Sequence, residues 1–295
     1  GHSPLHQQLE TTLARLFQRE AALTFASGYQ MNFGLLNALS TGKVLILADK
    51  LVHASMVDGL LISKAKFLRY RHNDMTHLHA LLCQYHAAFE RIIIVTESVF
   101  SMDGDIADLQ QLVAFKREFA NVALYVDEAH AIGVRGESGL GCAEEQGCVA
   151  EIDFLVGTFG KAVHSVGGYV VCSRLARAYL INHMRPLIFS TALPPINMAW
   201  TDFVLQRLHS LQAERTHLQQ LSSALINKVN TLQGHCVLQS HIVHILCGSN
   251  AAAHAQAQAF RAELTLELAK RFHAERLQRA DVLTDPDAVR LYLTA

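Results

Sequence analysis

Short apolar runs alternate along the chain with longer stretches in which an apolar residue recurs every three or four positions. The runs are typical of buried strands, and the stretches are typical of helices that bury one face. Strands and helices that alternate in this way pack as a mostly parallel central sheet with helices on both faces, so the pattern predicts an α/β fold. The expected strands cover residues 21–26, 44–48, 67–70, 91–96, 123–126, 154–156 and 169–172.

Signals near both ends of the chain predict further helices and a domain boundary. Ser3 is a plausible N-cap for a first helix. Towards the other end, two long amphipathic helices are expected over residues 197–232. We expect the boundary near Arg215. It would divide the chain into a large domain, residues 1–214, and a smaller C-terminal α/β domain, residues 215–295.

The composition restricts the classes of function. The chain has 295 residues, of which 51% are hydrophobic and 17% charged, and its net charge of −1 gives no basic surface for nucleic acid. Every apolar run is far shorter than the roughly 20 residues that a membrane span needs. The six cysteines show no Cys-x-x-Cys spacing and are expected as reduced thiols. We therefore expect a cytoplasmic protein with no nucleic-acid or membrane partner.

The chain has 17 histidines, which raises the question of a bound metal. Two groups stand out, His72 with His77 and His79, and His241 with His244. Neither group comes with the cysteine or carboxylate pattern that is typical of a zinc site. We expect no metal site.

A glycine-rich stretch at 156–168 carries a lysine between two apolar runs, so Lys161 is expected in a short loop between buried strands. Burial lowers the pKa of a lysine and frees its amine as a nucleophile, which suits Schiff-base chemistry with a carbonyl. The alternative is that the side chain extends from the loop into solvent, as most lysines do. This stretch alone leaves both interpretations open.

The apolar run 123–126 ends in Asp-Glu-Ala-His at 127–130. Ligands of open parallel sheets bind at the carboxyl ends of strands, so Asp127, His130 and Lys161 are expected to face one crevice. This set fits pyridoxal phosphate, which needs a lysine for its aldehyde, a carboxylate for its ring nitrogen and donors for its phenolate oxygen. The same four letters occur in a helicase box, but the chain lacks the phosphate-binding loop that a helicase requires.

Three motifs follow one another in a characteristic order: Thr-Glu-Ser-Val-Phe-Ser-Met-Asp-Gly-Asp at 96–105, Val-Asp-Glu-Ala-His at 126–130 and Thr-Phe-Gly-Lys-Ala at 158–162. Together they resemble the α-oxoamine synthases, pyridoxal-phosphate enzymes of fold type I, the aspartate-aminotransferase-like fold. The likeness runs from residue 1 to about residue 200. It implies a condensation of an amino acid with an acyl thioester of coenzyme A or an acyl-carrier protein. It also implies a homodimer, because the family's sites lie at a two-fold interface.

The resemblance also assigns roles to single residues. Lys161 would hold the cofactor and act as the base, Asp127 would pair with the ring nitrogen, and His53 would stack on the ring and border the substrate. For the hydroxyls of Ser190 and Thr191, which precede the double proline at 194–195, a structural role in the turn is an equal alternative to cofactor binding. The other implied cofactor contacts are Gly28 and Tyr29 at the phosphate, Ser101 and His130 near the phenolate oxygen, Thr158, and Ser190 or Thr191 at the cofactor phosphate of a second copy.

The last part of the chain departs from the family pattern. Family members carry an Arg-Pro-Pro-Thr-Val-Pro stretch, whose arginine binds the substrate carboxylate. Here residues 278–283 read Gln-Arg-Ala-Asp-Val-Leu, and Arg279 is the nearest candidate for that role. Family members also carry further residues ahead of the first helix. We therefore expect the large domain to be N-terminally incomplete and the C-terminal domain to be partial and divergent.

The sequence of residues 127–142 favours one branch of the family, which condenses L-alanine with a pimeloyl thioester in biotin biosynthesis. A branch that joins glycine to an acetyl thioester would share every cofactor residue and is an alternative. A third interpretation is a fragment or paralogue that keeps the fold without activity, because the substrate arginine region is altered.

Overall fold

The computed structural model of the protein describes residues 2–233, 240–243 and 247–274. Contacts between residues divide the chain into two compact units, 1–243 and 244–295. In the second unit, the described part is built on α11, Asn250–Ala274. The predicted division into two domains near residue 215 stays a prediction.

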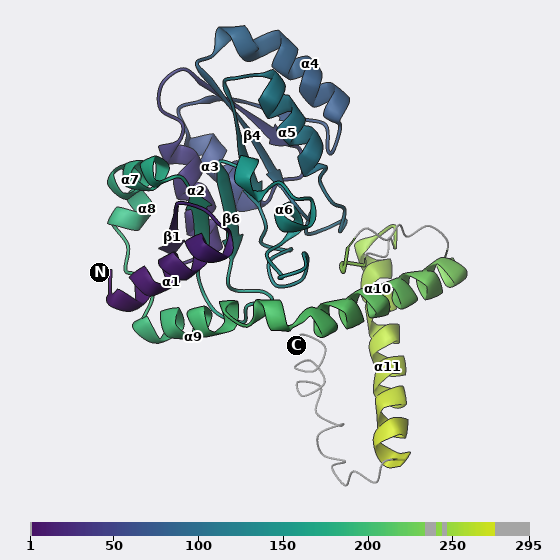
Figure 1. Ribbon diagram of the computed structural model, residues 1–295. Helices are drawn as coiled ribbons and strands as arrows, with labels where there is room; N and C mark the ends of the chain where they lie inside the picture. Colours follow the sequence, from purple (N-terminus) through teal and green to yellow (C-terminus); the bar gives the residue numbers. More distant parts are fainter. Residues whose placement is uncertain (1, 234–239, 244–246, 275–295) are drawn as a thin grey trace. The chain divides into compact units, whose positions relative to one another are not determined.

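Among the described residues, seven strands form one sheet at the centre of the first unit (Figure 1). They lie in the order β1-β7-β6-β5-β4-β2-β3. The five neighbouring strands β6, β5, β4, β2 and β3 are parallel to one another, whereas β7 runs antiparallel to both of its neighbours, β1 and β6. The predicted mostly parallel sheet is confirmed. The strands are β1 Ala21–Phe25, β2 Val44–Asp49, β3 Lys66–Tyr70, β4 Arg91–Glu97, β5 Val122–Asp127, β6 Phe154–Thr158 and β7 Gly168–Cys172.

The central strands are apolar on both faces because successive side chains alternate between two layers of helices. In β2, Leu45 and Leu47 pack with one layer, and Ile46 and Ala48 pack with the other. One layer consists of α1 Pro4–Leu16, α4 Met75–Tyr85, α5 Leu109–Glu118, α6 Cys142–Glu145 and α9 Pro195–Leu205. The other consists of α2 Gly28–Ala38, α3 Ala54–Ile62, α7 Arg174–His183 and α8 Arg185–Ile188.

The two amphipathic helices expected over residues 197–232 are α9 and α10, Gln212–Gln233. A short 3₁₀ turn, η3 Leu208–Ser210, separates them. Two further 3₁₀ turns are η1 His86–Ala88 and η2 Val149–Glu151. No helix in the described ranges has both the length and the apolar composition that crossing a membrane requires.

Candidate active site

A cavity of about 210 Å³ lies at the carboxyl edge of the sheet. Three parallel strands end there, with Glu97 at the end of β4, Asp127 at the end of β5 and Thr158 at the end of β6. Ligands of open α/β sheets bind at this edge, so the cavity is the candidate active site. It is lined by Gly28, Tyr29, Met31, Asn32, His53, Ser55, Glu97, Asp127, Ala129, Gly157, Thr158 and Lys161.

Asp127 is a buried carboxyl group of the cavity, with 5% of its surface exposed. Its Oδ2 accepts a hydrogen bond from Asn32 Nδ2 at 2.8 Å, and its Oδ1 accepts one from the Ala129 main-chain N–H at 2.8 Å. The Tyr125 hydroxyl holds Asn32 in turn by donating to its Oδ1 at 2.5 Å. Burial raises the pKa of Asp127, and the two donors offset this increase in part. The carboxyl group is therefore fixed in orientation at the cavity.

Lys161 lies in the loop between β6 and β7, as expected, and its Nζ is 2.8 Å from Nε2 of His130. Part of the lysine is exposed through the open cavity, yet the protein around its amine lowers the pKa of Lys161 by desolvation. Burial, followed by the charge of Lys161, lowers the pKa of His130 to about 4. The imidazole is therefore neutral at pH 7, and Nε2 is available to accept a hydrogen bond from Lys161.

The N-terminus of α2 offers a place for an anion. The Oγ of Ser27 caps the helix by accepting a hydrogen bond from the Gln30 main-chain N–H at 3.1 Å. The first N–H groups of a helix, here those of Gly28 and Tyr29, have no partner within the helix. Gly168 of β7 packs closely on this turn, since a Cβ added there would lie 3.1 Å from the Gly28 Cα. The residues predicted at the cofactor phosphate thus form a capped helix start beside the cavity.

His53 is the N-cap of α3 and lines the cavity. Its Nδ1 accepts a hydrogen bond from the Ser55 main-chain N–H at 3.2 Å and lies 2.8 Å from Ser55 Oγ. Ser55 Oγ also accepts a hydrogen bond from Asn32 Nδ2 at 3.1 Å. Because Asn32 also binds Asp127, a single network orients the histidine ring and the buried carboxylate.

Three polar side chains that line the cavity have no site role predicted from the sequence: Asn32, Ser55 and Glu97. Asn32 was detectable in principle, because it is a polar residue on the buried face of the apolar helix α2. Glu97 belongs to the motif at 96–105, but the motif does not assign it a role. It is 3% exposed, and burial together with the charge of Asp127 raises the pKa of Glu97 to about 8.

Glu128 has a different environment from its neighbour Asp127. Its carboxylate accepts hydrogen bonds from Ser98 Oγ at 2.6 Å, the Cys142 N–H at 2.9 Å and the Ala143 N–H at 2.7 Å. Burial raises the pKa of Glu128 to about 7, an increase that these three donors limit. The residue holds the start of α6, which is a structural role.

Some predicted site residues are not brought to the cavity. Ser101 lies in the loop after β4 and is not among the lining residues in the described part of the chain. Ser190 and Thr191 are exposed and border a separate cavity of about 520 Å³. Arg279 lies outside the described residues.

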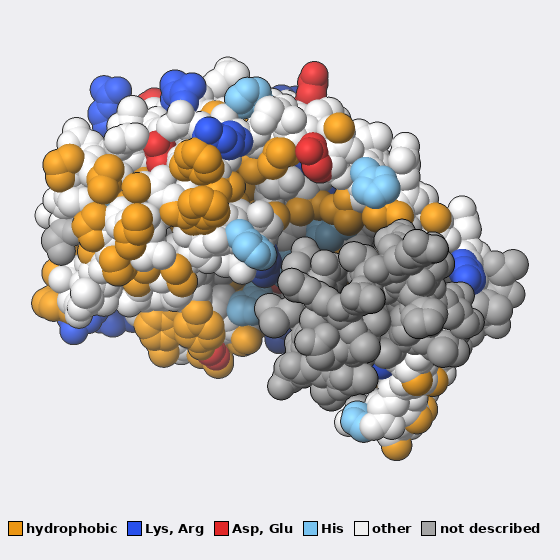
Figure 2. All heavy atoms as spheres, turned by 90° about the horizontal axis from the view of Figure 1, so that it is seen from below, with side chains coloured by type: hydrophobic (Ala, Val, Ile, Leu, Met, Phe, Trp, Pro, Cys, Tyr) orange, Lys and Arg blue, Asp and Glu red, His pale blue; other side chains and the backbone are white. Residues whose placement is uncertain are grey.

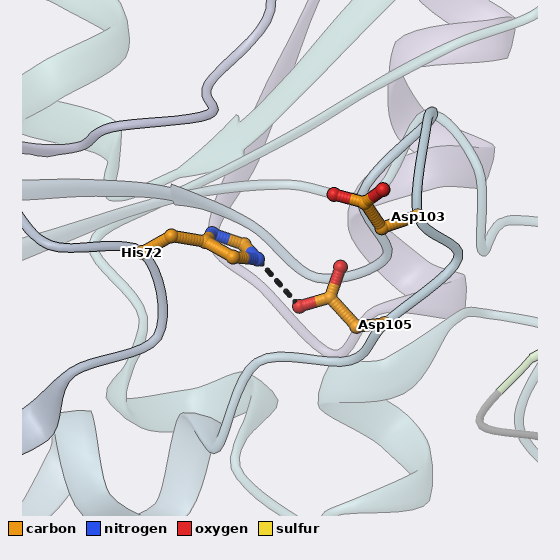
Figure 3. Close-up of side chains that lie close together, drawn as sticks. All are labelled: His72, Asp103 and Asp105. Carbon is orange, nitrogen blue, oxygen red and sulfur yellow. Dashed lines mark hydrogen bonds and ion pairs between the residues drawn. The ribbon is translucent and has the colours of Figure 1, made fainter. Parts of the chain in front are cut away.

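His72 lies between the carboxylates of Asp49 and Asp105, of which Figure 3 shows Asp105. Its Nδ1 is 2.8 Å from Asp49 Oδ1, and its Nε2 is 2.7 Å from Asp105 Oδ2. Asp103 lies on the loop that also carries Asp105, as Figure 3 shows. His72, Asp103 and Asp105 form a group whose possible ligand atoms lie close enough together to hold a metal ion. Carboxylates already engage both ring nitrogens, which favours an ion-paired imidazolium. Burial lowers the pKa of His72, but Asp49 and Asp105 outweigh this effect, so the pKa is raised.

The substitution His72→Gln is expected to lower the free energy of unfolding by about 1–3 kcal/mol at pH 6. The raised pKa of His72 in the folded state means that this stability is fully present below the ordinary value of 6.5. It is lost as the pH rises through the folded-state pKa. Urea unfolding of the parent and of His72→Gln, followed by circular dichroism at pH 6 and pH 9, measures the difference in the free energy of unfolding at each pH.

The matched control for this prediction is His79→Gln. His79 pairs with Glu118 at 3.0 Å on the exposed surface, so its loss is expected to cost about 0–1 kcal/mol. A destabilisation by His72→Gln that grew with increasing pH would contradict the assignment of an imidazolium at this position.

The family model "Aminotransferase class I and II" matches residues 1–291. A Pasteurella multocida protein named "Putative 8-amino-7-oxononanoate synthase" is 57% identical over 251 residues, which are 85% of this chain and 65% of that protein. A Haemophilus influenzae protein of the same name is 56% identical over 258 residues, covering 88% of this chain and 68% of that protein. The chain thus spans about two thirds of the length of these relatives.

Solved structures of two further enzymes are also similar to this chain. Serine palmitoyltransferase from S. paucimobilis, with a bound PLP–myriocin aldimine, matches with a TM-score of 0.80 and 31% identity over 85% of this chain and 65% of that chain. An 8-amino-7-oxononanoate synthase from Francisella tularensis matches with a TM-score of 0.67 and 29% identity over 79% of this chain and 69% of that chain. The predicted fold type is confirmed by these similarities.

Proposed function

Because the chain belongs to the class I and II aminotransferase family, and within it to the α-oxoamine synthases, we propose that it acts as an 8-amino-7-oxononanoate synthase. The reaction joins L-alanine to a pimeloyl thioester, releases carbon dioxide and frees the thiol of coenzyme A or of an acyl-carrier protein. The observation that carries this proposal is the identity of 56–57% to relatives of that name.

Pyridoxal phosphate is the cofactor, and the cavity fits it in three respects. Asp127 is a buried carboxyl group whose hydrogen-bond donors among the described residues are both uncharged, and a protonated ring nitrogen would supply a cationic partner. The start of α2 presents unpaired N–H groups for a phosphate. Lys161 offers an amine with a lowered pKa and lines the same cavity as these two features. The donor set therefore matches the functional groups of the cofactor.

The bound cofactor supplies an aldehyde for an amine and a protonated ring that accepts an electron pair. In the proposed site, Asp127 would hold a proton on the ring nitrogen by charge pairing, since a buried carboxylate favours a cation beside it. Asn32 and the Ala129 N–H fix the direction of that carboxylate. The ring of His53, fixed by Ser55, would cover one face of a bound cofactor ring and exclude water from it.

Lys161 has two tasks in the proposed mechanism. Its Nζ would hold the cofactor, because the cofactor supplies an aldehyde for an amine. With L-alanine in the site, Nζ would remove the proton from the Cα of alanine, a task that suits a lysine whose pKa is lowered by desolvation. His130, neutral at pH 7, keeps Nζ in place through the 2.8 Å contact. The remaining expected contacts, Ser101, Thr158 and Arg279, stay proposals by family resemblance.

We also propose that the protein is a homodimer. Hydrophobic side chains around α8 and α9 are exposed to an unusual degree, with Phe189 at 72% and Ile196 at 73%. Figure 2, which views the molecule from below, shows hydrophobic side chains gathered on the side where these helices lie. Exposed apolar patches of this kind mark protein interfaces. Ser190 and Thr191 lie between α8 and α9, where a second copy would meet them.

The proposed function is tested by measuring thiol release and carbon dioxide release with defined substrate pairs. We expect turnover with L-alanine plus pimeloyl-CoA to exceed turnover with glycine plus acetyl-CoA by about tenfold or more. The opposite preference would assign the chain to the glycine-dependent branch. Cofactor binding without turnover of either pair would contradict both assignments and indicate a protein that keeps the fold alone.

A further inference from the structure

Glu97 and Asp127 are neighbours across the sheet. They are paired in the register of the parallel strands β4 and β5, where each is the last residue of its strand. Both line the candidate cavity together with Lys161. Glu97 is 3% exposed, so the cavity brings two buried carboxyl groups to one ligand site. Two such groups in contact with one site do not both ionise easily.

The two oxygens of Glu97 have different surroundings. The carboxyl group accepts a hydrogen bond from the main-chain N–H of His53, the N-cap of α3. The second oxygen, Oε1, is buried and has no hydrogen-bond partner among the described residues. A buried polar atom without a partner costs free energy, more so when the group is charged. The arrangement therefore suits a neutral acid better than a carboxylate.

The charges that face Glu97 point to the same protonation state. Burial is the largest effect, and the negative charges of Asp127 and Asp49 add to it, whereas the His53 N–H and the Lys161 charge oppose it. The balance raises the pKa of Glu97 to about 8. At pH 7 most of the population holds the proton, and the site carries its negative charge on Asp127.

We propose that Glu97 is a positioning residue of this site, which anchors the main chain of His53 and stays neutral so that Asp127 alone presents negative charge to the cofactor ring nitrogen. This inference rests on the proposed function, because it gives the pair a role toward pyridoxal phosphate. Ionised Glu97 would place a second negative charge beside a cofactor that carries an anionic phosphate, and would raise the pKa of Lys161.

The test measures the dissociation constant of pyridoxal phosphate by ultrafiltration at pH 6.5 and pH 9.5, for the full chain and for Glu97→Gln and Glu97→Ala. Glutamine keeps an acceptor for the His53 N–H and never ionises. We expect Glu97→Gln to match the parent within about threefold at pH 6.5 and to bind about tenfold more tightly than the parent at pH 9.5. Glu97→Ala is expected to bind about tenfold more weakly at both values, since the His53 N–H loses its acceptor.

The matched control is Glu90→Gln, an exposed glutamate just before the other end of β4, which should follow the parent at both pH values. Titration of the cofactor itself is common to all variants, and Lys161 titrates differently in Glu97→Gln only because the Glu97 charge is gone. The ratio between the parent and Glu97→Gln therefore reports the ionisation of Glu97, both directly and through Lys161. If Glu97→Ala fails to fold by circular dichroism, Glu97→Gln carries the test alone.

Two results would overturn the inference while leaving the proposed function intact. One is an identical pH response in the parent and Glu97→Gln. The other is a loss of binding in Glu97→Gln at pH 6.5, which would show that the ionised carboxylate is needed. A parent chain that bound no pyridoxal phosphate at all would overturn the proposed site and the role of Glu97 together.

Discussion

Replacing Lys161 by alanine is expected to lower the rate of condensation by about a thousandfold or more, because the variant loses both the amine that binds the cofactor and the proposed general base. Among the described residues that line the cavity, only Lys161 carries an amine. The measurement has two parts, the initial rate of thiol release and the covalent attachment of the cofactor. Attachment is trapped with borohydride and located by peptide mass spectrometry.

The control for Lys161 is Lys64→Ala, which removes an exposed lysine just after α3. It is expected to keep the parent's rate and the parent's attachment site. Turnover retained in Lys161→Ala, or a cofactor attached to another lysine in the parent, would contradict the assignment. A folded Lys161→Ala chain that still binds pyridoxal phosphate reversibly agrees with it, since the phosphate and ring contacts come from other residues.

The substitution Asp127→Asn is expected to lower the rate by roughly a hundredfold or more, because an amide cannot hold a proton on the ring nitrogen by charge pairing. The volume is unchanged, so any effect on stability should be small by comparison. The initial rate and the urea unfolding curve, measured on the same preparation, separate the two effects.

A second variant at this position sharpens the test. Asp127→Glu keeps the charge but moves it by one methylene from the donors of Asn32 and Ala129, so an intermediate rate is expected. Equal rates for Asp127→Asn and the parent would contradict a charged partner for the ring nitrogen. A rate for Asp127→Glu as low as that of Asp127→Asn would show that position matters as much as charge.

The apolar runs predicted the strands within a few residues, and the alternation of strands with helices predicted the sheet. The positions of Lys161 and Asp127 next to strand ends also predicted that the two side chains face one crevice. These features are local in the sequence, since each depends on a run of neighbouring side chains and on where that run stops. The antiparallel pairing of β7 with β1 and β6 was not predicted, because the direction of a strand depends on distant partners.

The polar network around the cavity was decided by tertiary structure. Asn32 is separated from Asp127 by 95 residues, and only the packing of α2 on the sheet brings them together. Glu97 and Asp127 are likewise joined by strand register. The local sequence patterns around Asn32, Glu97 and Asp127 do not specify these contacts.

The adjacent acids Asp127 and Glu128 show most clearly that the sequence predicts where a side chain stands in the chain but not what surrounds it. The sequence by itself determined that two carboxylates end a buried strand, together with the fold class and the lysine loop. Only the tertiary structure decided that Asp127 borders the cavity while Glu128 binds the start of α6. The physical reason is that successive side chains point to opposite faces of a sheet, and what covers each face comes from distant parts of the chain.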